Sequence, residues 1–339
     1  KNKVFSYDGR VNLNENWSTD IQLINSSLKN SEAVDKSGDM YNIRLDRQGN
    51  HLNIHTHYIN VSEDFVADLA FLPRNYRPDN KSWHSRVSYN FIPESGFLNQ
   101  WGPSIFVNKI LDQNSLDLYE EFIGTFTWKW DGYTELKLDY YDTKESLRPE
   151  DHNSISSIRN YKYNNFKISF SSKFLTNLFF NFDIAQGEAI NLLPAKGKEP
   201  EIGDTDEFTL GITWKPFGQL NIDTSILQSS LKDKISNARI FNNEIMRAKL
   251  NYQFSKEISL RFIAQKDITM PSNMTSLENT KGINYDLLFR YVINPWSAFY
   301  VGYNYNSSNF QVVDTENGRE LIRVPELYRD GEQFFIKFS

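Results

Sequence analysis

Residues 281–306 constrain the fold most strongly, because their side chains alternate in character with a period of two. One phase of the first half contains Ile283, Tyr285, Leu287, Phe289, Tyr291 and Ile293, and the other contains Asn284, Asp286 and Arg290. A turn at 294–296 follows, after which the alternation resumes with Phe299, Val301, Tyr303 and Tyr305. The stretch therefore predicts a β-hairpin with one aromatic-aliphatic face and one polar face.

The same unit recurs along almost the whole chain and predicts an all-β fold. The strand-like segments are 3–13, 17–28, 39–48, 51–60, 82–92, 103–113, 117–130, 133–144, 157–172, 176–187, 204–215, 218–230, 240–254, 257–268, 281–293, 296–308 and 330–339. Many exceed the five or six residues usual in soluble sheets, and a tilted strand that crosses a membrane needs about 9–11.

Composition is compatible with a membrane β-barrel and excludes several other classes. Mean hydropathy is −0.57 and no apolar run approaches the roughly 18 residues of a membrane helix, yet 15% of the 339 residues are aromatic. In a barrel only every second residue meets lipid, so mean hydropathy stays low. The net charge of −6 argues against nucleic acid as a partner, and the absence of cysteine excludes disulfides and thiolate metal sites.

The predicted connections are of two kinds. Those after residues 13, 48, 130, 172, 215, 254 and 293 are short, with a longer exception after 92; the alternate ones are mostly long and polar, at 29–38, 61–81, 145–156, 188–203, 231–239, 269–280 and 309–329. Outer-membrane barrels have short periplasmic turns and long extracellular loops. Five tryptophans lie beside short turns and are candidates for an interfacial aromatic girdle, with hairpin packing in a soluble sheet as the alternative: Trp17, Trp128, Trp130, Trp214 and Trp296.

The polar phase carries many charges. The candidates for lining a lumen are Arg10, Arg44, His55, His57, His84, Arg86, Lys137, Asp139, Lys167, Asp183, Asp223, Arg247, Lys249, Arg261, Asp286 and Arg290. Such a face is too costly for the dry core of a β-sandwich, although a wet lumen or bulk solvent accommodates it. Together with the loop asymmetry, it predicts an antiparallel transmembrane β-barrel of about 17–18 strands in the bacterial outer membrane.

Two long connections, 61–81 and 309–329, are candidates for filling the lumen. The first contains Phe65, Phe71, Arg74, Tyr76 and Arg77, which suit packing against a barrel wall, and an extracellular loop stacked on its neighbours is the equal alternative. If both termini are periplasmic, the strand count must be even. At least one further strand is therefore expected before Lys1, in a longer protein.

No catalytic, cofactor-binding or metal site is predicted. His55 and His57 share the polar phase with His84, which is compatible with a metal, but a polar lumen explains them more simply. No Gly-x-Ser-x-Gly motif occurs. Tyr140, Tyr141, Tyr161 and Tyr163 near the outer rim suit either sugar stacking or a second girdle.

Several segments carry a family resemblance: FVADLAFLPRNYRPD, DGYTELKLDYYDTKESLRP, LNYQFSKEISLRFIAQ, YDLLFRYVINPWSAFYVGYN and the ending DGEQFFIKFS. Together they resemble the C-terminal barrel of an uncharacterised bacterial outer-membrane family. Its members carry an N-terminal domain similar to family-9 carbohydrate-binding modules and are sometimes labelled membrane-associated hydrolases. The resemblance implies missing upstream strands and a missing domain, and it implies no established activity.

Three functions are compatible with this architecture. The first is a passage or docking platform for a polar solute such as an oligosaccharide, with lumen charges setting selectivity. The second is a plugged structural anchor that holds an N-terminal carbohydrate-binding domain at the membrane. The third is a hydrolase of surface glycans or lipids. Outer-membrane lipids are the expected partners in each case, and no cofactor is expected.

Overall fold

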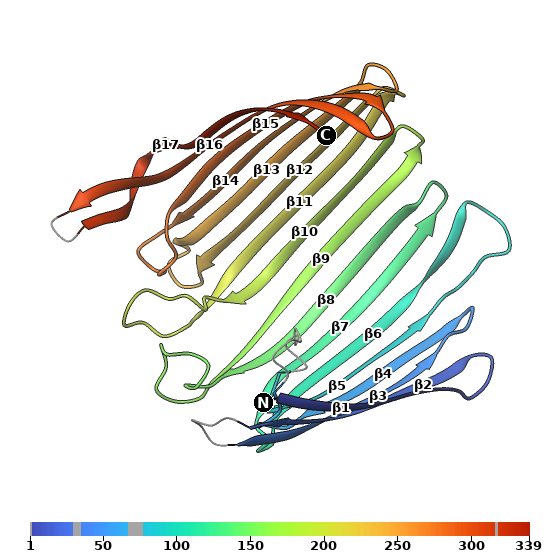
Figure 1. The fold of residues 1–339 in the computed structure, drawn as a ribbon. Coiled ribbons are helices and arrows are strands. Elements are labelled where there is room, and N and C mark those ends of the chain that lie inside the picture. Colours follow the sequence, from blue (N-terminus) through green and yellow to red (C-terminus); the bar gives the residue numbers. More distant parts are fainter. Residues whose placement is uncertain (1, 30–34, 67–76, 316–317) are drawn as a thin grey trace. The chain divides into compact units, whose positions relative to one another are not determined.

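The computed structural model describes residues 2–29, 35–66, 77–315 and 318–339, and in this part of the chain 17 strands belong to one antiparallel sheet (Figure 1). Their bounds are β1 Asn2–Asn12, β2 Trp17–Leu28, β3 Lys36–Arg47, β4 Leu52–Val61, β5 Asn80–Tyr89, β6 Leu98–Asp112, β7 Asp117–Trp130, β8 Thr134–Leu147, β9 Arg159–Leu175, β10 Leu178–Ile190, β11 Ile202–Phe217, β12 Leu220–Asp233, β13 Arg239–Gln253, β14 Ile258–Pro271, β15 Thr280–Asn294, β16 Ser297–Thr315 and β17 Gly318–Phe338. Each strand predicted from the alternation is present, so the all-β antiparallel fold is confirmed.

The chain divides into two compact units. Unit 1 comprises Lys1–Lys129 and Lys137–Phe166, and unit 2 comprises Trp130–Leu136 and Lys167–Ser339. Within unit 1, β1 to β6 each pair antiparallel with the next strand in sequence. Within unit 2, β10 to β17 do the same. This meander of neighbouring hairpins is the topology expected when every connection is local.

The hairpin of β15 and β16 has the register that its alternation predicts. Leu287 lies opposite Tyr303 on one face, and Asp286 lies opposite Asn304 on the other. The turn between the two strands is held by the Asn294 side chain, whose Oδ1 accepts a hydrogen bond from the Trp296 amide at 2.9 Å. Asn14 forms the equivalent turn between β1 and β2, accepting from the amides of Asn16 and Trp17. Asparagine suits these tight turns because its side chain replaces a backbone acceptor.

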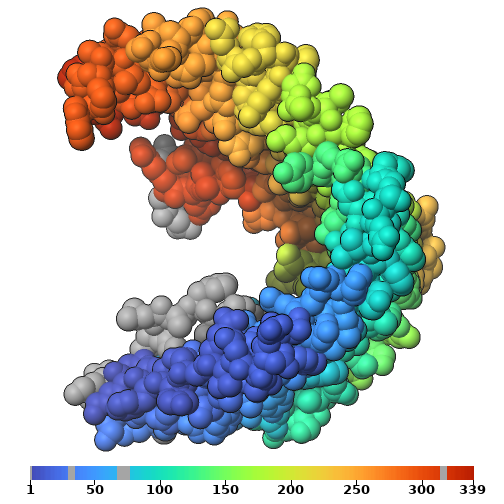
Figure 2. Space-filling view, turned by 90° about the vertical axis from the view of Figure 1, so that its right-hand side faces the viewer, coloured from blue at the N-terminus to red at the C-terminus, as the bar shows by residue number. Residues whose placement is uncertain are grey.

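The apolar face of the sheet is exposed rather than buried. Figure 2 shows the atoms of the first strands of unit 1 in blue to cyan. Phe5 is 69% exposed in unit 1, and Phe334 is 64% exposed in unit 2. Many other large apolar side chains of the described residues are also exposed. A soluble protein does not expose so extensive an apolar surface to water. Lipid is the solvent that this face requires.

No helix in the described part of the chain is long and apolar enough to cross a membrane.

The connections largely follow the predicted lengths. The link between β6 and β7 spans residues 113–116 and is about as short as the predicted segments 103–113 and 117–130 imply. The segment 309–329, expected to be an irregular loop, is strand apart from residues 316–317, because β16 continues to Thr315 and β17 begins at Gly318. The reason lies partly in β-favouring residues at the ends of the two strands, where Val312 pairs with Leu321 and Gln311 with Ile322.

The start of the longest loop packs against the polar-phase side of unit 1. Phe65 is 3% exposed and forms a small core with Met40, Ile59, Val61 and the partly buried Ile24. The Val66 amide donates to Ser26 Oγ at 3.0 Å, and the Asp39 amide donates to Ser62 Oγ at 2.8 Å. Met40 and Ile59 share the phase of Arg44 and His57, so residues 62–66 fold over the polar side of β2 to β4.

Gly38 makes this close approach possible. A Cβ atom added at Gly38 would lie 2.3 Å from the Phe65 nitrogen and 2.5 Å from its Cα. Gly38→Ala is therefore expected to push Phe65 out of its core and to cost about 1–3 kcal/mol. Faster hydrogen exchange at the Val66 amide would report it. Gly124→Ala is the control, because its nearest neighbour would be a Phe122 ring carbon at 3.6 Å, and unchanged exchange in both variants would contradict the prediction.

Candidate functional site

A row of polar side chains crosses unit 1 from strand to strand. The register places Arg10 opposite Asp20, Asp20 opposite Arg44, Arg44 opposite His57, and His57 opposite His84. Residues opposite one another in a sheet share a face, so one surface of β1 to β5 carries this whole row. The structure thus brings together four of the residues predicted to line a lumen, and it adds Asp20, which was not among them.

Ion pairs compensate most charges in the row. Asp20 Oδ1 lies 3.5 Å from Arg10 Nε in an ion pair, and Asp20 also contacts Arg44, while Arg44 Nε lies 3.0 Å from Asp46 Oδ2. An open pocket of about 360 Å³ lies over these groups and is lined by Asp8, Arg10, Asp20, Asn42, Arg44 and His57, among others. The charged groups beside this water-accessible hollow suit a hydrated, hydrogen-bonding ligand better than an apolar one.

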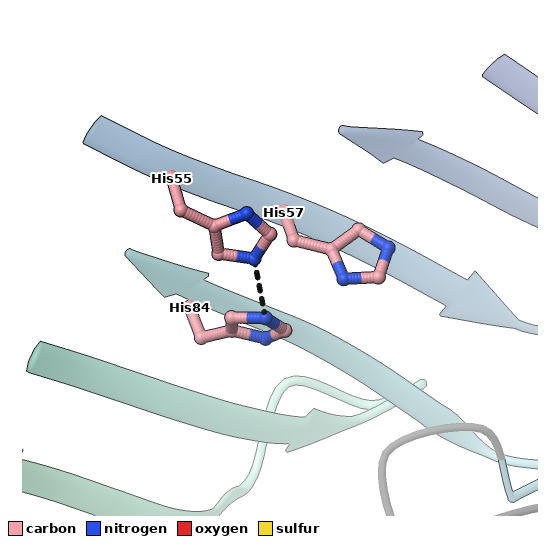
Figure 3. A group of neighbouring side chains, drawn as sticks. All are labelled: His55, His57 and His84. Carbon is pink, nitrogen blue, oxygen red and sulfur yellow. Dashed lines mark hydrogen bonds between the residues drawn. The ribbon is translucent and has the colours of Figure 1, made fainter. Parts of the chain in front are cut away.

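Three histidines meet beside this pocket, as Figure 3 shows: His55 and His57 from β4, and His84 from β5. One ring nitrogen from each lies within 4.8 Å of the other two. His55 Nε2 and His84 Nε2 are 3.2 Å apart, and the centroids of His57 and His84 are 4.9 Å apart. These three residues are the group in the described chain that could hold a metal ion.

Arg86 and the pair Lys137–Asp139 complete the predicted polar residues of unit 1. The Arg86 guanidinium lies 4.9 Å from the centroid of the Phe106 ring, a cation–π contact. Asp139 is 1% exposed, with Lys137 Nζ at 3.0 Å and the Thr125 hydroxyl at 2.6 Å. A buried carboxylate is tolerated there because a cation and a hydroxyl donor both reach it.

Unit 2 has a polar face of the same kind. Lys167 pairs with Asp183 at 3.2 Å, Arg261 pairs with Asp286 at 3.3 Å, and Asp223 accepts from Thr213 at 2.9 Å. The register places Lys249 opposite Asp223, and Arg247 opposite Ser225 and Gln265. Within the described residues Arg247, Lys249 and Arg290 make no ion pair, and neither do Glu207, Asp223 and Asp267 on the same face.

The predicted plug residues are placed only in part. Phe65 packs against the polar-phase side of β2 to β4, and Arg77 is exposed. Phe71, Arg74 and Tyr76 lie outside the described residues. A plugging role for 61–81 therefore stays a prediction.

The predicted girdle tryptophans lie at the short-turn ends of their strands. Trp296 is 90% exposed in the β15–β16 turn, and Trp214 is 44% exposed near the end of β11. Trp17, Trp128 and Trp130 are partly exposed, and Trp128 packs on Phe126 with ring centroids 4.4 Å apart. Amphipathic rings at the ends of lipid-facing strands occupy the depth of the headgroups in membrane barrels.

Sequence reasoning missed one cluster at the loop end of unit 1. Arg148 bonds Asp79 and Asp151 at 2.8 Å each and lies 3.6 Å from Asp112. Burial lowers the pKa of the Arg148 guanidinium, hydrogen bonds to Asp151 and Asp79 raise it, and the net pKa is above its usual value. Asp79 is 69 residues away in sequence, and no local pattern signals such a contact.

No family model matches the chain, and neither does any curated protein. Among solved structures, the outer-membrane protein OmpT of Vibrio cholerae in its trimer form is 10% identical, with 99% of this chain and 98% of that chain covered and a TM-score of 0.40. A porin is 11% identical, with 84% and 99% covered and a TM-score of 0.43. The siderophore receptor PiuA of Acinetobacter baumannii is 9% identical, with 94% and 64% covered and a TM-score of 0.46. These scores support no conclusion about activity.

The exposed apolar face decides the class of protein. Long antiparallel strands present aromatic and aliphatic side chains outward on one phase and ion-paired side chains on the other. A β-sheet is stable in lipid only as part of a barrel wall, because lipid cannot hydrogen-bond to unpaired backbone groups. The chain is an outer-membrane β-barrel protein. Its polar face is of the kind that an aqueous passage through such a barrel requires.

Proposed function

We propose that this outer-membrane barrel protein forms a passage for polar solutes. The supporting observation is the contrast between the two faces of each unit: an exposed apolar face, and a polar face with charged side chains such as Arg44 and Arg261. Charged side chains along a wall are compatible with water and unfavourable against lipid. A polar face inside a barrel of this strand number leaves room for a channel.

The cations of unit 2 that make no ion pair among the described residues support a charge preference for the proposed passage. Arg247 and Lys249 stand on the same face of β13, and Arg290 stands on the polar face of β15. Rings or clusters of cationic side chains favour anions in pores. The passage is therefore expected to favour anionic solutes over cationic ones of the same size.

Planar-bilayer conductance tests both statements. The purified protein should form channels whose reversal potential in a KCl gradient indicates anion preference. The double variant Arg247→Glu and Lys249→Glu should shift that potential toward cation preference, because it reverses two charges on the polar face. Lys256→Glu, in the exposed β13–β14 turn, is the control and should leave the potential unchanged. A protein that inserts but never conducts would exclude the passage.

We further propose that the solute is an oligosaccharide. This more specific proposal rests on the resemblance to the family with carbohydrate-binding domains. Liposome swelling separates sugar passage from ion passage. Liposomes containing the protein should swell in isotonic maltose or a longer maltooligosaccharide, whereas protein-free liposomes should not. Conductance without swelling in any sugar would restrict the passage to smaller solutes.

One observation favours the second candidate, a plugged anchor. Phe65 buries its ring on the polar-phase side of unit 1, as a loop that enters a lumen would do. For a plugged barrel, replacing residues 65–78 by a short Gly/Ser linker should convert a silent protein into a conducting one. If the unaltered chain already conducts and the replacement changes nothing, the anchor is excluded.

A further inference from the structure

The three clustered histidines have the chemistry of a metal site. We propose that His55, His57 and His84 bind a divalent first-row transition-metal ion such as Zn²⁺ or Cu²⁺ on the polar face of β4 and β5. Imidazole nitrogens are the usual ligands of these ions, and three histidines with one open position are an established ligand set. The site does not depend on whether the barrel conducts.

The spacing of the nitrogens is close to that of a coordinated set. Two nitrogens on one tetrahedral ion, each about 2.0–2.1 Å from it, lie roughly 3.3 Å apart. His55 Nε2 and His84 Nε2 are already 3.2 Å apart, and the third nitrogen lies within 4.8 Å of both. To complete the set, the His57 nitrogen would have to approach the other two from within 4.8 Å to about this spacing. The backbone register supports this, because His57 is directly opposite His84 and two residues from His55.

Neighbouring oxygens orient two of the rings for binding. Asp46 Oδ1 lies 2.6 Å from His55 Nδ1, so this nitrogen carries the proton and Nε2 offers its lone pair. Asn42 Oδ1 contacts His57 Nε2, which leaves Nδ1 as the unprotonated nitrogen of that ring. A carboxylate or carbonyl behind each ligating histidine is the arrangement found at protein metal sites, where it fixes the tautomer and raises basicity.

Two buried polar atoms at the third histidine, His84, lack hydrogen-bond partners among the described residues. His84 Nδ1 and the Oδ1 of Asn108, the residue opposite His84 on β6, are buried without a hydrogen-bond partner among the described residues. Buried polar atoms without partners cost free energy and point to an absent ion or water. Asp46 also contacts Arg44, so one carboxylate supports both the neighbouring cation and the His55 ring.

Metal titration of the full chain, folded in detergent, tests the proposal. Zn²⁺ binding would be measured by competition with a chromophoric chelator, and Co²⁺ would report ligand geometry through its visible spectrum. We expect one ion per chain, with affinity falling at least about 10-fold in each of His55→Gln, His57→Gln and His84→Gln. Asp46→Asn, which keeps all three ligands, should weaken binding by about 10- to 100-fold.

The two remaining histidines provide the control. The double variant His51→Gln and His152→Gln removes imidazoles outside the cluster and should bind Zn²⁺ as tightly as the unaltered chain. Circular dichroism and heat-modifiable gel mobility would establish that every variant is folded. Absence of stoichiometric binding by the folded unaltered chain would overturn the proposal, and so would an equal loss in the control variant.

Discussion

Replacing Leu287 by arginine is expected to cost the protein about 2–4 kcal/mol of stability in a lipid bilayer. Leu287 lies in the middle of β15, 40% exposed, with Phe262 and Tyr303 opposite it on the neighbouring strands. On this face an arginine must meet hydrocarbon, and a charged group near the bilayer midplane is poorly solvated. Urea unfolding from lipid vesicles, followed by tryptophan fluorescence, would measure the change.

The matched control places the same side chain on the other face of the same hairpin. Asn304→Arg puts a guanidinium on the polar face opposite Asp286 and is expected to change stability by no more than about 0.5 kcal/mol. Equal losses in the two variants would show that both faces meet the same solvent, which would contradict the membrane assignment. A large loss of stability for Asn304→Arg alone would indicate that the face of Asn304, and not the face of Leu287, meets lipid.

Replacing Arg148 by methionine is expected to cost about 2–3 kcal/mol. The Arg148 side chain is 17% exposed and is the shared cation of Asp79, Asp112 and Asp151, of which Asp112 is only 8% exposed. Methionine keeps much of the volume but leaves these carboxylates without their cation. The Asp79 and Asp112 side chains also accept from the amides of Gln113 and Leu116, so repulsion between them should loosen the 113–116 link. Hydrogen exchange at these two amides would detect it.

An exposed ion pair of the same unit is the control for Arg148. Lys144 pairs with Glu120 at 3.2 Å, but the two side chains are 57% and 46% exposed. Water already solvates both groups, so Lys144→Met should cost less than about 1 kcal/mol and leave the exchange of Gln113 and Leu116 unchanged. If the two variants behave alike, Arg148 has no special role in tying the loops of unit 1 together.

The strands could be predicted because each carries its own period-two signal. Leu287 and Asp286 already indicate opposite faces of β15 without knowledge of any neighbour. The end of the chain was less predictable. The alternation predicted a strand only from residue 330, because Arg319, Glu320 and Pro325 interrupt the apolar pattern before it. The strand β17 in fact begins at Gly318. Pairing with the apolar end of β16 compensates for that weak local signal.

The histidine cluster and the Arg148 cluster show what local patterns leave open. The phase of the strands predicted that His55, His57 and His84 share a face. Their convergence depends on the register of β4 against β5, and the long connection between these strands does not constrain it. Arg148 reaches Asp79 from a different loop, and the two residues share no strand pair that a sequence pattern could reveal. Contacts between loops depend on tertiary packing alone.

The length of the β16–β17 hairpin determines how far the protein reaches from the cell. The strands have 19 and 21 residues, whereas about 9–11 are enough to cross the hydrocarbon layer. At about 3.3 Å per residue, the surplus makes a ribbon roughly 30 Å long on the side of the long connections, which is extracellular in such barrels. Arg323 secures its base, with its guanidinium 4.0 Å from the Phe310 ring centroid and Nε bonded to Glu278 at 2.7 Å. We therefore expect the described parts of this ribbon to be accessible to a protease added to intact cells.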